Sequence, residues 1–455
     1  MKTIKYIDLF AGIGGFRHGF EKACNEVGFT PKCVFTSEIK PHAIQIYEAN
    51  FGKENIHGDI TKINAKDIPK FDVLLAGFPC QAFSSAGKRQ GFLDTRGTLF
   101  FEIERILQAH KPSAFILENV EGLVNHDKEN STDSIGRTLS VILEKLKELG
   151  YKTTWKVLDA SNFGLAQARK RIFIVGTKKS SLSLSDFQPN RIPLKEFLEK
   201  GVSAAPLKIS EVLFEKYKPK QLYGKSIKDK RGGKNNIHSW DIELKGSVTD
   251  EQKILLDKLL RARRNKKWGE IKGITWMDGM PLTIEEIKSF HNVKNLKNML
   301  DDLVEKNYLV FEHPKDIVVI EASGVSQKVR TPREDIPKGY NIVAGKLSFE
   351  VSKILDPEHV APTLVATDIG RVAVIDGKKL RRLTLTEQLR LFGFPDNFII
   401  PVKERFAHDV FGNTVPVVVV EAISKRLLSQ VFLGLPYKEE QHPTHSNQIE
   451  LDLYN

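Results

Sequence analysis

The first 180 residues alternate between two kinds of segment, and this alternation limits the possible folds more than any other feature of the sequence. Short runs rich in apolar and β-branched residues, typical of buried strands, are separated by longer stretches whose apolar residues recur at helical spacing. We predict strands at residues 5–10, 32–36, 71–75, 114–117, 153–158 and 172–175 and helices at residues 16–27, 41–50, 99–110 and 135–149. Strands that alternate with helices form βαβ units, so the pattern predicts an α/β fold whose largely parallel sheet has helices on both faces.

The rhythm of the sequence changes after this region and returns near the end. Residues 181–365 show no such alternation and carry two clusters of lysine and arginine, at 216–234 and 261–267. Regular patterns resume at 366–436, where we predict helices at residues 384–392 and 415–432. We therefore predict a first domain at 1–180, a smaller inserted domain at 181–365, a return to the first domain at 366–436, and a loosely held polar tail at 437–455.

Charge and cysteine content bear on the partners of the chain. Its 69 Lys and Arg exceed its 57 Asp and Glu, which gives a formal net charge of +12. Such an excess is compatible with nucleic-acid binding, although a solvated basic surface is its commoner cause. No apolar run approaches the roughly 20 residues that cross a bilayer. Three cysteines and no export signal indicate reduced thiols, so we expect a cytoplasmic bacterial protein with no membrane partner.

A glycine-rich turn directly follows the first predicted strand. It has the sequence Asp8-Leu9-Phe10-Ala11-Gly12-Ile13-Gly14-Gly15 and leads into the first predicted helix. Glycines at such a turn let a ligand approach the backbone, but the turn alone fits NAD, FAD, S-adenosylmethionine or no ligand at all. Glu38 and Asp59 stand at the ends of the next two strand regions. Each could be only a helix cap, yet two acids at successive strand ends favour a nucleoside pocket.

A cysteine and a glutamate follow two later strands. Cys80 lies in Gly77-Phe78-Pro79-Cys80-Gln81, just after the strand at 71–75, and Glu118 directly follows the strand at 114–117. The carboxyl ends of parallel strands meet at one edge of a sheet, where ligands of open α/β folds bind. We therefore expect a nucleophile and an acid to share this edge, whereas Cys24 and Cys33 are expected to be packing residues.

These motifs, in this order, resemble those of the DNA (cytosine-5) methyltransferases of bacterial restriction–modification type. The matching segments are Phe10–Gly15, Pro79-Cys80-Gln81, Glu118-Asn119-Val120, Gln167-Ala168-Arg169-Lys170-Arg171, residues 382–395, and Gly412-Asn413-Thr414-Val415-Pro416. Methyltransferases that act on amino nitrogens have a Pro-Pro-aromatic loop in place of Pro79-Cys80-Gln81. The resemblance implies a Rossmann-like, S-adenosylmethionine-dependent methyltransferase fold in which residues 181–365 are an inserted target-recognition domain.

The resemblance also implies a set of catalytic residues. The Cys80 thiolate would attack carbon 6 of a cytosine flipped out of duplex DNA, while Glu118 acts on ring nitrogen 3, so that carbon 5 becomes nucleophilic. Arg169 would contact the cytosine carbonyl oxygen and Arg171 would support the catalytic loop, although a pair of surface arginines facing phosphate is an alternative for both. The loop after Cys80 would contact DNA through Gln81, Ser84, Ser85 and Lys88.

The cofactor implied by the resemblance is S-adenosyl-L-methionine. Phe10 would contact its adenine ring, Glu38 its ribose, Asp59 its adenine amino group and Asn413 its methionine end. Gly12, Gly14, Ile39, Ile60, Gly77 and Leu99 would complete the pocket. Ile39 stands where relatives often have an aromatic residue, which weakens the expected stacking on adenine. No metal is expected.

Three functions remain open from the sequence. The leading one is a sequence-specific DNA methyltransferase that acts as a monomer. It is either the protective half of a restriction–modification pair, with a separate restriction endonuclease, or the source of a solitary epigenetic mark. A tRNA cytosine-5 methyltransferase is the second, although that branch usually has a shorter recognition segment. A catalytically silent nucleic-acid-binding module is the third. In the middle segment, the basic clusters are expected to be exposed and could contact phosphate, whereas Trp240, Trp268 and Trp276 are expected to be core residues.

Overall fold

A computed structural model gives the positions of most of the chain. It describes residues 2–53, 56–79, 99–130, 132–204, 207–229, 233, 235–275, 279–322, 325–343 and 349–435. The chain divides into two units. Unit 1 comprises Met1–Val202, Pro357–Gly370 and Leu383–Asn455, and unit 2 comprises Ser203–Asp356 and Arg371–Arg382.

A seven-stranded sheet forms the centre of unit 1. Its strands are β1 (Lys2–Leu9), β2 (Phe29–Ser37), β3 (Ile56–His57), β4 (Val73–Gly77), β5 (Ala114–Val120), β6 (Lys152–Asp159) and β7 (Lys170–Thr177), in the order β3-β2-β1-β4-β5-β7-β6. The first five strands of this order are parallel, and β7 lies antiparallel between β5 and β6. The prediction of a largely parallel α/β sheet is confirmed, and all six predicted strands are present.

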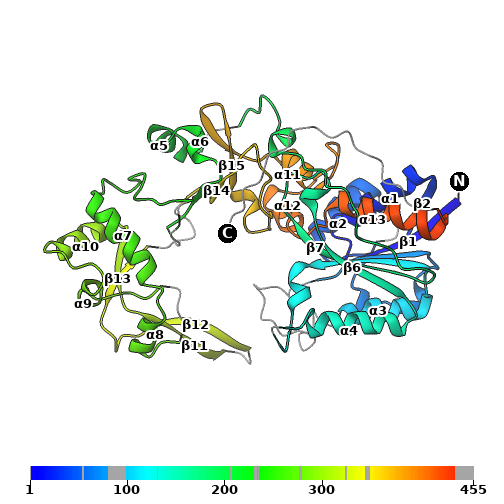
Figure 1. Cartoon of the computed structure of the whole chain (residues 1–455), viewed down its shortest axis with the longest axis horizontal. Helices are drawn as coiled ribbons and strands as arrows, with labels where there is room; N and C mark the ends of the chain where they lie inside the picture. The colour runs from blue at the N-terminus through cyan, green and yellow to red at the C-terminus, as the bar shows by residue number, and fades with distance from the viewer. Residues whose placement is uncertain are drawn as a thin grey trace. The chain divides into compact units, whose positions relative to one another are not determined.

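Two layers of helices cover this sheet, as Figure 1 shows. The helices of unit 1 are α1 (Gly15–Val27), α2 (Pro41–Phe51), α3 (Leu99–His110), α4 (Arg137–Glu148), α11 (Leu385–Phe392), α12 (Glu404–Phe411) and α13 (Val417–Leu427), the last continued by the π-helical turn η8 (Leu428–Phe432). Side chains alternate along β1, so Ile7 and Leu9 pack with the residues of α3 and α4, while Ile4 and Tyr6 pack with those of α1 and α13. Both faces of the sheet are therefore buried.

The C-terminal return is held against α1 by a close approach of two helices. Gly19 in α1 lies so near α13 that a β-carbon at this position would be 2.7 Å from the Val417 carbonyl oxygen. This contact closes unit 1, because α13 supplies Val419, Val420 and Ile423 to the core on that face of the sheet. Among the described residues, no helix combines the length and the apolar character that a membrane span requires.

Unit 2 is built from shorter elements. Its helices are α5 (Ile209–Lys216), α6 (Pro219–Leu222), α7 (Asp250–Ala262), α8 (Lys267–Lys272), α9 (Ile284–Lys288) and α10 (Leu296–Glu305). Its strands are β8 (Ser226–Ile227), β9 (Asn236–Ile237), β10 (Leu309–Glu312), β11 (Lys315–Ala322), β12 (Val325–Pro332), β13 (Gly339–Ile342), β14 (Lys353–Ile354), β15 (Val372–Asp376) and β16 (Lys379–Arg382). β10 pairs with β13, β11 pairs with β12, and the remaining five form one sheet.

Two expectations from the sequence concern unit 2, one about its tryptophans and one about its second basic cluster. Trp240 and Trp268 are buried in the core of unit 2, as predicted, and Trp276 lies outside the described residues. The second basic cluster does not form a uniformly exposed surface, because the Arg263 side chain is 1% exposed. Its guanidinium donates to the Asn341 Oδ1 atom at 2.7 Å. The burial of Arg263 corrects the expectation of an exposed cluster.

The packing of β7 against β5 generates a stability prediction. A β-carbon on Gly176 would lie 2.1 Å from the Phe115 ring, so the substitution Gly176→Ala must displace a buried aromatic side chain. We expect it to lower the free energy of unfolding by about 1–3 kcal/mol, as overpacking of cores does. Urea unfolding measures this change. Gly58→Ala is the matched control, because a β-carbon there would meet nothing within 4 Å.

Candidate functional site

The turn between β1 and α1 is held in a conformation that suits glycine. Phe10, Gly12 and Gly14 have φ angles of 56°, 56° and 86°, all in the left-handed region. A β-carbon on Gly14 would lie 2.3 Å from the Phe51 ring, whereas one on Gly12 would meet nothing within 4 Å. The backbone at Gly12 therefore borders open space, where a ligand could approach it closely.

Glu38, at the end of β2, holds this turn in place. Its Oε2 atom accepts a hydrogen bond from the Gly12 amide at 2.7 Å. Its Oε1 atom accepts from the Ile39 and Lys40 amides, both at 2.8 Å. The carboxylate is nearly buried, while the neighbouring Ile39 side chain is 66% exposed. An exposed aliphatic side chain beside an anchored carboxylate fits one wall of a nucleoside pocket.

Asp59 follows β3 and has a local structural role. Its Oδ1 atom accepts hydrogen bonds from the Thr61 amide at 3.1 Å and from the Thr61 hydroxyl at 2.8 Å. These bonds cap the short helical turn η1 (Ile60–Lys62) and lower the pKa of Asp59 below its usual value. Ile60 beside it is buried. Both of these hydrogen bonds end on Oδ1, so the helix cap leaves the Oδ2 atom of Asp59 unused.

The carboxyl end of β5 brings together an acid and an arginine. Glu118, which is 8% exposed, forms an ion pair with Arg171 of β7, whose Nε atom lies 3.0 Å from Oε1. Burial raises the pKa of Glu118 above its ordinary value, and the charges of Arg171 and Arg169 oppose this shift. Glu118 therefore tends to keep a proton to higher pH than a solvated carboxyl group.

The strand that leads to Cys80 passes beside this acid. Gly77, the last residue of β4, pairs with Glu118 in the sheet, and a β-carbon on Gly77 would be 3.5 Å from the Glu118 Oε2 atom. Asn119 donates from Nδ2 to the Phe78 carbonyl at 3.2 Å and so fixes the chain as it leaves β4. The sequence motif contains Asn119, but no role was predicted for it. Cys80, Gln81, Ser84, Ser85 and Lys88 lie outside the described residues.

The two arginines of the Gln167–Arg171 motif have different surroundings. Whereas Arg171 reaches Glu118, Arg169 is 1% exposed and turned toward main-chain carbonyl groups. Its guanidinium donates to the carbonyl oxygens of Leu364 at 3.1 Å, Gly412 at 2.9 Å and Thr414 at 2.7 Å. Arg171 is thus the arginine beside the acid, and Arg169 holds main-chain carbonyl groups of three later residues in place.

The remaining predicted cofactor residues are not all joined to this site by described contacts. Asn413 is exposed and donates from Nδ2 to the Asp409 carbonyl at 2.7 Å, while Leu99 is the first residue of α3. Thr414 lies beside the glycine turn, since a β-carbon on Gly15 would be 2.9 Å from its Oγ1 atom. In the described ranges, no three His, Cys, Asp or Glu side chains are grouped as a metal site would need.

Asp8 is a buried acid in β1 whose burial the sequence motifs did not predict. It lies in β1 with 0% exposure, and neither carboxylate oxygen has a hydrogen-bond partner among the described residues. Burial raises its pKa to about 8, with a further rise from Glu38 and Glu21 and an opposing effect of Arg17. The sequence gives one indication of this burial, because Asp8 stands in an apolar run just before the glycine turn.

Comparison with known proteins gives a consistent result. A family model described as C-5 cytosine-specific DNA methylase matches residues 4–429. The chain is 56% identical to the Type II methyltransferase M.NlaIV of Neisseria lactamica, over 94% of this chain and 99% of that protein. It is 40% identical to the Type II methyltransferase M.BanI of Aneurinibacillus aneurinilyticus, over 93% and 95%.

Solved structures resemble the fold. The Entamoeba histolytica methyltransferase EhMeth aligns with a TM-score of 0.51 and 16% identity, over 96% of this chain and 100% of that one. The Dnmt2 methyltransferase of S. pombe aligns with a TM-score of 0.50 and 15% identity, over 93% and 98%. At these identities the likeness concerns the fold alone.

The different surroundings of the two arginines predict different effects on stability. We expect Arg169→Met to lower the free energy of unfolding by about 3 kcal/mol or more, because several buried carbonyl groups lose a charged donor. Arg171→Met should cost less than about 1 kcal/mol, since Glu118 can take up a proton when its partner is removed. Urea unfolding of both variants measures the two changes. Equal losses of unfolding free energy would contradict a structural role of Arg169 that Arg171 does not share.

The buried carboxyl group of Asp8 predicts a pH dependence of stability. Because its folded pKa of about 8 exceeds the ordinary value of 3.8, the folded state holds a proton that the unfolded state releases in this interval. Stability due to Asp8 should therefore fall as the pH rises, by up to about 1.4 kcal/mol per pH unit. Urea unfolding of the wild type and Asp8→Asn from pH 5 to pH 8 measures the difference, and parallel profiles would refute the shift.

Proposed function

The chain belongs to the C-5 cytosine-specific DNA methylase family, and from this premise we propose which of its residues perform the reaction. It is a DNA methyltransferase that uses S-adenosyl-L-methionine to methylate carbon 5 of cytosine. The observation that carries the assignment of residues is the Glu118–Arg171 pair at the carboxyl end of β5, beside the strand that leads to Cys80.

The turn after β1 suits the methyl donor. We assign Gly12 and Gly14 to the backbone that borders it, Glu38 to its ribose hydroxyl groups and Ile39 to the wall beside its adenine. Phe10, Asp59, Ile60, Gly77, Leu99 and Asn413 are assigned to the same pocket. When bound, the donor supplies an electrophilic sulfonium methyl group. The residues of the chain bind it, orient it and hold it at the edge of the sheet.

The chemistry at the cytosine ring needs a nucleophile and an acid. We propose that the Cys80 sulfur forms a bond to carbon 6 while the Glu118 carboxyl group gives a proton to ring nitrogen 3, so that electron density moves to carbon 5. After carbon 5 has gained the methyl group, a base removes the proton that remains on carbon 5. The carbon–sulfur bond then breaks to release the Cys80 thiolate, and the proton on ring nitrogen 3 returns to Glu118. Burial of Glu118 supports this role, because a raised pKa lets the carboxyl group hold the proton it must donate.

The two arginines act differently in this proposal. Arg171 forms an ion pair with Glu118, which supports our assignment of Arg171 to the base beside the acid. Arg169 is a positioning residue, because its guanidinium is bonded to the carbonyl groups of Leu364, Gly412 and Thr414. Gln81, Ser84, Ser85 and Lys88 follow Cys80 closely in the sequence. We assign these four residues to contacts with the DNA around the extruded base.

Unit 2 and the partners of the chain complete the proposal. We assign recognition of the target sequence to unit 2, which contains most of residues 181–365. We expect a separate restriction endonuclease that cuts the same DNA sequence, since relatives of this chain are named Type II methyltransferases. A monomer suffices for the reaction, because Glu118, Arg171 and Glu38 all belong to one unit of one chain. Gel filtration of the pure protein checks this state.

Methylation in cells tests the function and the catalytic assignment together. Bisulfite sequencing of plasmid DNA from cells that express the wild type should show unconverted cytosines in one short recurring sequence. We expect Cys80→Ala to reduce methylation about a thousandfold or more, because the covalent step is lost. Glu118→Gln should reduce it by about 10²- to 10⁴-fold, as loss of an acid–base group does.

Two controls make this result interpretable. Gly58→Ala should methylate the plasmid as the wild type does, because a β-carbon there meets nothing within 4 Å. Uniform conversion of all cytosines with folded wild-type protein would contradict the DNA substrate, and transfer to tRNA would then be measured. Full activity of Cys80→Ala would overturn the covalent mechanism while leaving the methyltransferase function intact.

A further inference from the structure

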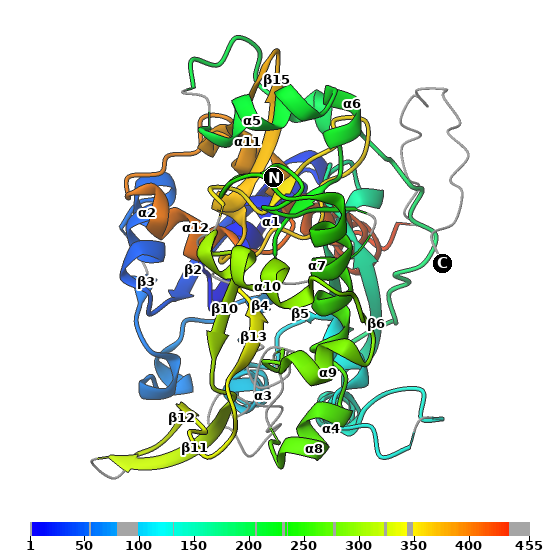
Figure 2. The same cartoon turned by 90° about the vertical axis from the view of Figure 1, so that its left-hand side faces the viewer.

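A two-stranded ribbon in unit 2 is exposed on both faces. Strands β11 and β12 pair with each other and, within the described residues, with no other strand. Figures 1 and 2 show this pair continuing beyond β10 and β13. Its aliphatic side chains are open to solvent, with exposures of 36% for Ile317, 45% for Val318, 55% for Val319 and 39% for Val329. An isolated ribbon of this kind is only marginally stable in water, so a binding partner that covers it would stabilise it.

The register gives the two faces of this ribbon different character. Ile317 pairs with Arg330 and Lys315 pairs with Pro332, so the side chains of these residues share one face. Val318 and Val329 share the other face with Asp316 and Thr331. The first face therefore presents two cations around an aliphatic residue. Asp316, on the second face, is near Arg333, at 3.8 Å.

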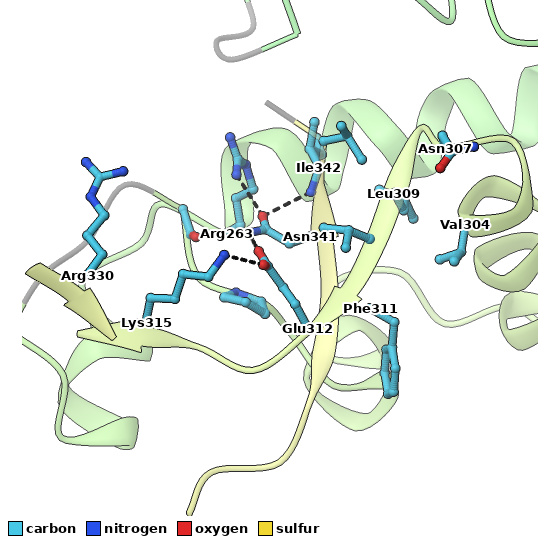
Figure 3. Close-up of a pocket in the computed structure, with 14 residues that line it drawn as sticks. Arg263, Val304, Asn307, Leu309, Phe311, Glu312, Lys315, Arg330, Asn341 and Ile342 are labelled. Atoms are coloured by element: carbon cyan, nitrogen blue, oxygen red, sulfur yellow. Dashed lines mark hydrogen bonds and ion pairs between the residues drawn. The ribbon is translucent and has the colours of Figure 1, made fainter. Parts of the chain in front are cut away.

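The basic face borders a cavity of about 670 Å³, drawn in Figure 3. The charged residues that line it are Arg263, Lys315, Arg330 and Glu312, three cations against one carboxylate. Its apolar lining includes Leu309, Phe311 and Ile342. The excess of positive charge suits an anionic partner with flat, partly apolar surfaces, which is the chemistry of nucleic acid.

A polar network that starts at the buried Arg263 fixes the first residues of the ribbon. Arg263 donates to the Asn341 Oδ1 atom at 2.7 Å, and the Asn341 Nδ2 atom donates to the Glu312 Oε1 atom at 3.1 Å. Glu312 in turn pairs with Lys315, whose Nζ atom is 2.5 Å from Oε2. These contacts join α7, β10, β11 and β13. They hold the start of the ribbon in one orientation, while Arg330 lies further along β12 and is exposed.

We propose that the β11–β12 ribbon enters the major groove of the substrate duplex and that Arg330 reads a base there. The inference rests on the DNA methyltransferase function and names the part of unit 2 that sets its sequence specificity. The major groove, about 12 Å wide, admits a two-stranded β-ribbon. Arginine donates two hydrogen bonds to the O6 and N7 atoms of guanine, and exposed Ile317 and Val319 suit contact with thymine methyl groups. Arg263 and Asn341 are positioning residues for the ribbon.

The test compares methylation of every sequence variant of the target. The wild-type chain and Arg330→Ala are incubated with a pool of duplexes in which each position of the target found by bisulfite sequencing is randomised. Relative rates are read by sequencing after bisulfite treatment. We expect Arg330→Ala to lose about 5- to 150-fold of discrimination at one position, the loss that removal of a bidentate base contact produces. Discrimination at the other positions should not change.

Arg261→Ala is the matched control. This arginine is exposed in the last turn of α7, so its removal deletes the same charge from the same unit. We expect it to leave the order of preference among sequences unchanged. Thermal unfolding with the same midpoint as the wild type verifies that both variants are folded.

Each other outcome overturns the inference. Unchanged specificity of Arg330→Ala would exclude base reading by this residue, and an equal loss of rate for all sequences would identify a phosphate contact instead. A wild-type dimer that Val319→Lys converts to a monomer would identify the ribbon as an interface between copies. These results differ from failure of the proposed function, in which the wild type would leave no methylated cytosine in any sequence.

Discussion

The main-chain carbonyl groups of Leu364, Gly412 and Thr414 need buried donors, and the guanidinium of Arg169 supplies them. A buried carbonyl group without a donor is costly, so this one side chain ties the sheet to two later segments of unit 1. Gln167 adds to the same junction, because its Nε2 atom donates to the Leu391 carbonyl and its Oε1 atom accepts from the Leu364 amide. The position of the Glu118–Arg171 pair depends on this junction, since β7 starts directly after Arg169 and carries Arg171 to Glu118.

The two halves of the proposed active site use buried acids in opposite ways. Glu38 accepts hydrogen bonds from three backbone amides and so fixes the glycine turn. Glu118 has a raised pKa because burial outweighs the attraction of its arginine neighbours. The Glu38 carboxyl group thus holds the backbone of the turn in place, and the Glu118 carboxyl group keeps a proton to higher pH than a solvated one. The difference comes from what surrounds each side chain, because both acids stand at the carboxyl ends of parallel strands in the same sheet, β2 and β5.

The fold of unit 1 could be predicted well because its elements have strong local periodicity. The helix predicted at 99–110 has the observed limits of α3, and the strand predicted at 32–36 is the centre of β2. Unit 2 could not be predicted in this way, because most of its strands have only two to five residues and too few side chains for a period to appear. Some of its helices did leave a signal. Thr249 with Gln252 and Thr283 with Glu286 form capping boxes at the starts of α7 and α9, a pattern visible in the sequence.

The sequence by itself determined the α/β class, the family and the set of chemical groups, because strand periodicity and motif spacing are local properties of the chain. Only the tertiary structure decided which arginine meets Glu118. Arg169 and Arg171 are two residues apart, so a continuous strand would place both on one face. The strand begins instead at Lys170, and the Arg169 amide is bonded to Asp159, which lets its side chain turn toward the C-terminal return. The burial of Arg263 was decided in the same way, by the polar partners that distant segments bring to it and not by its place in a basic run.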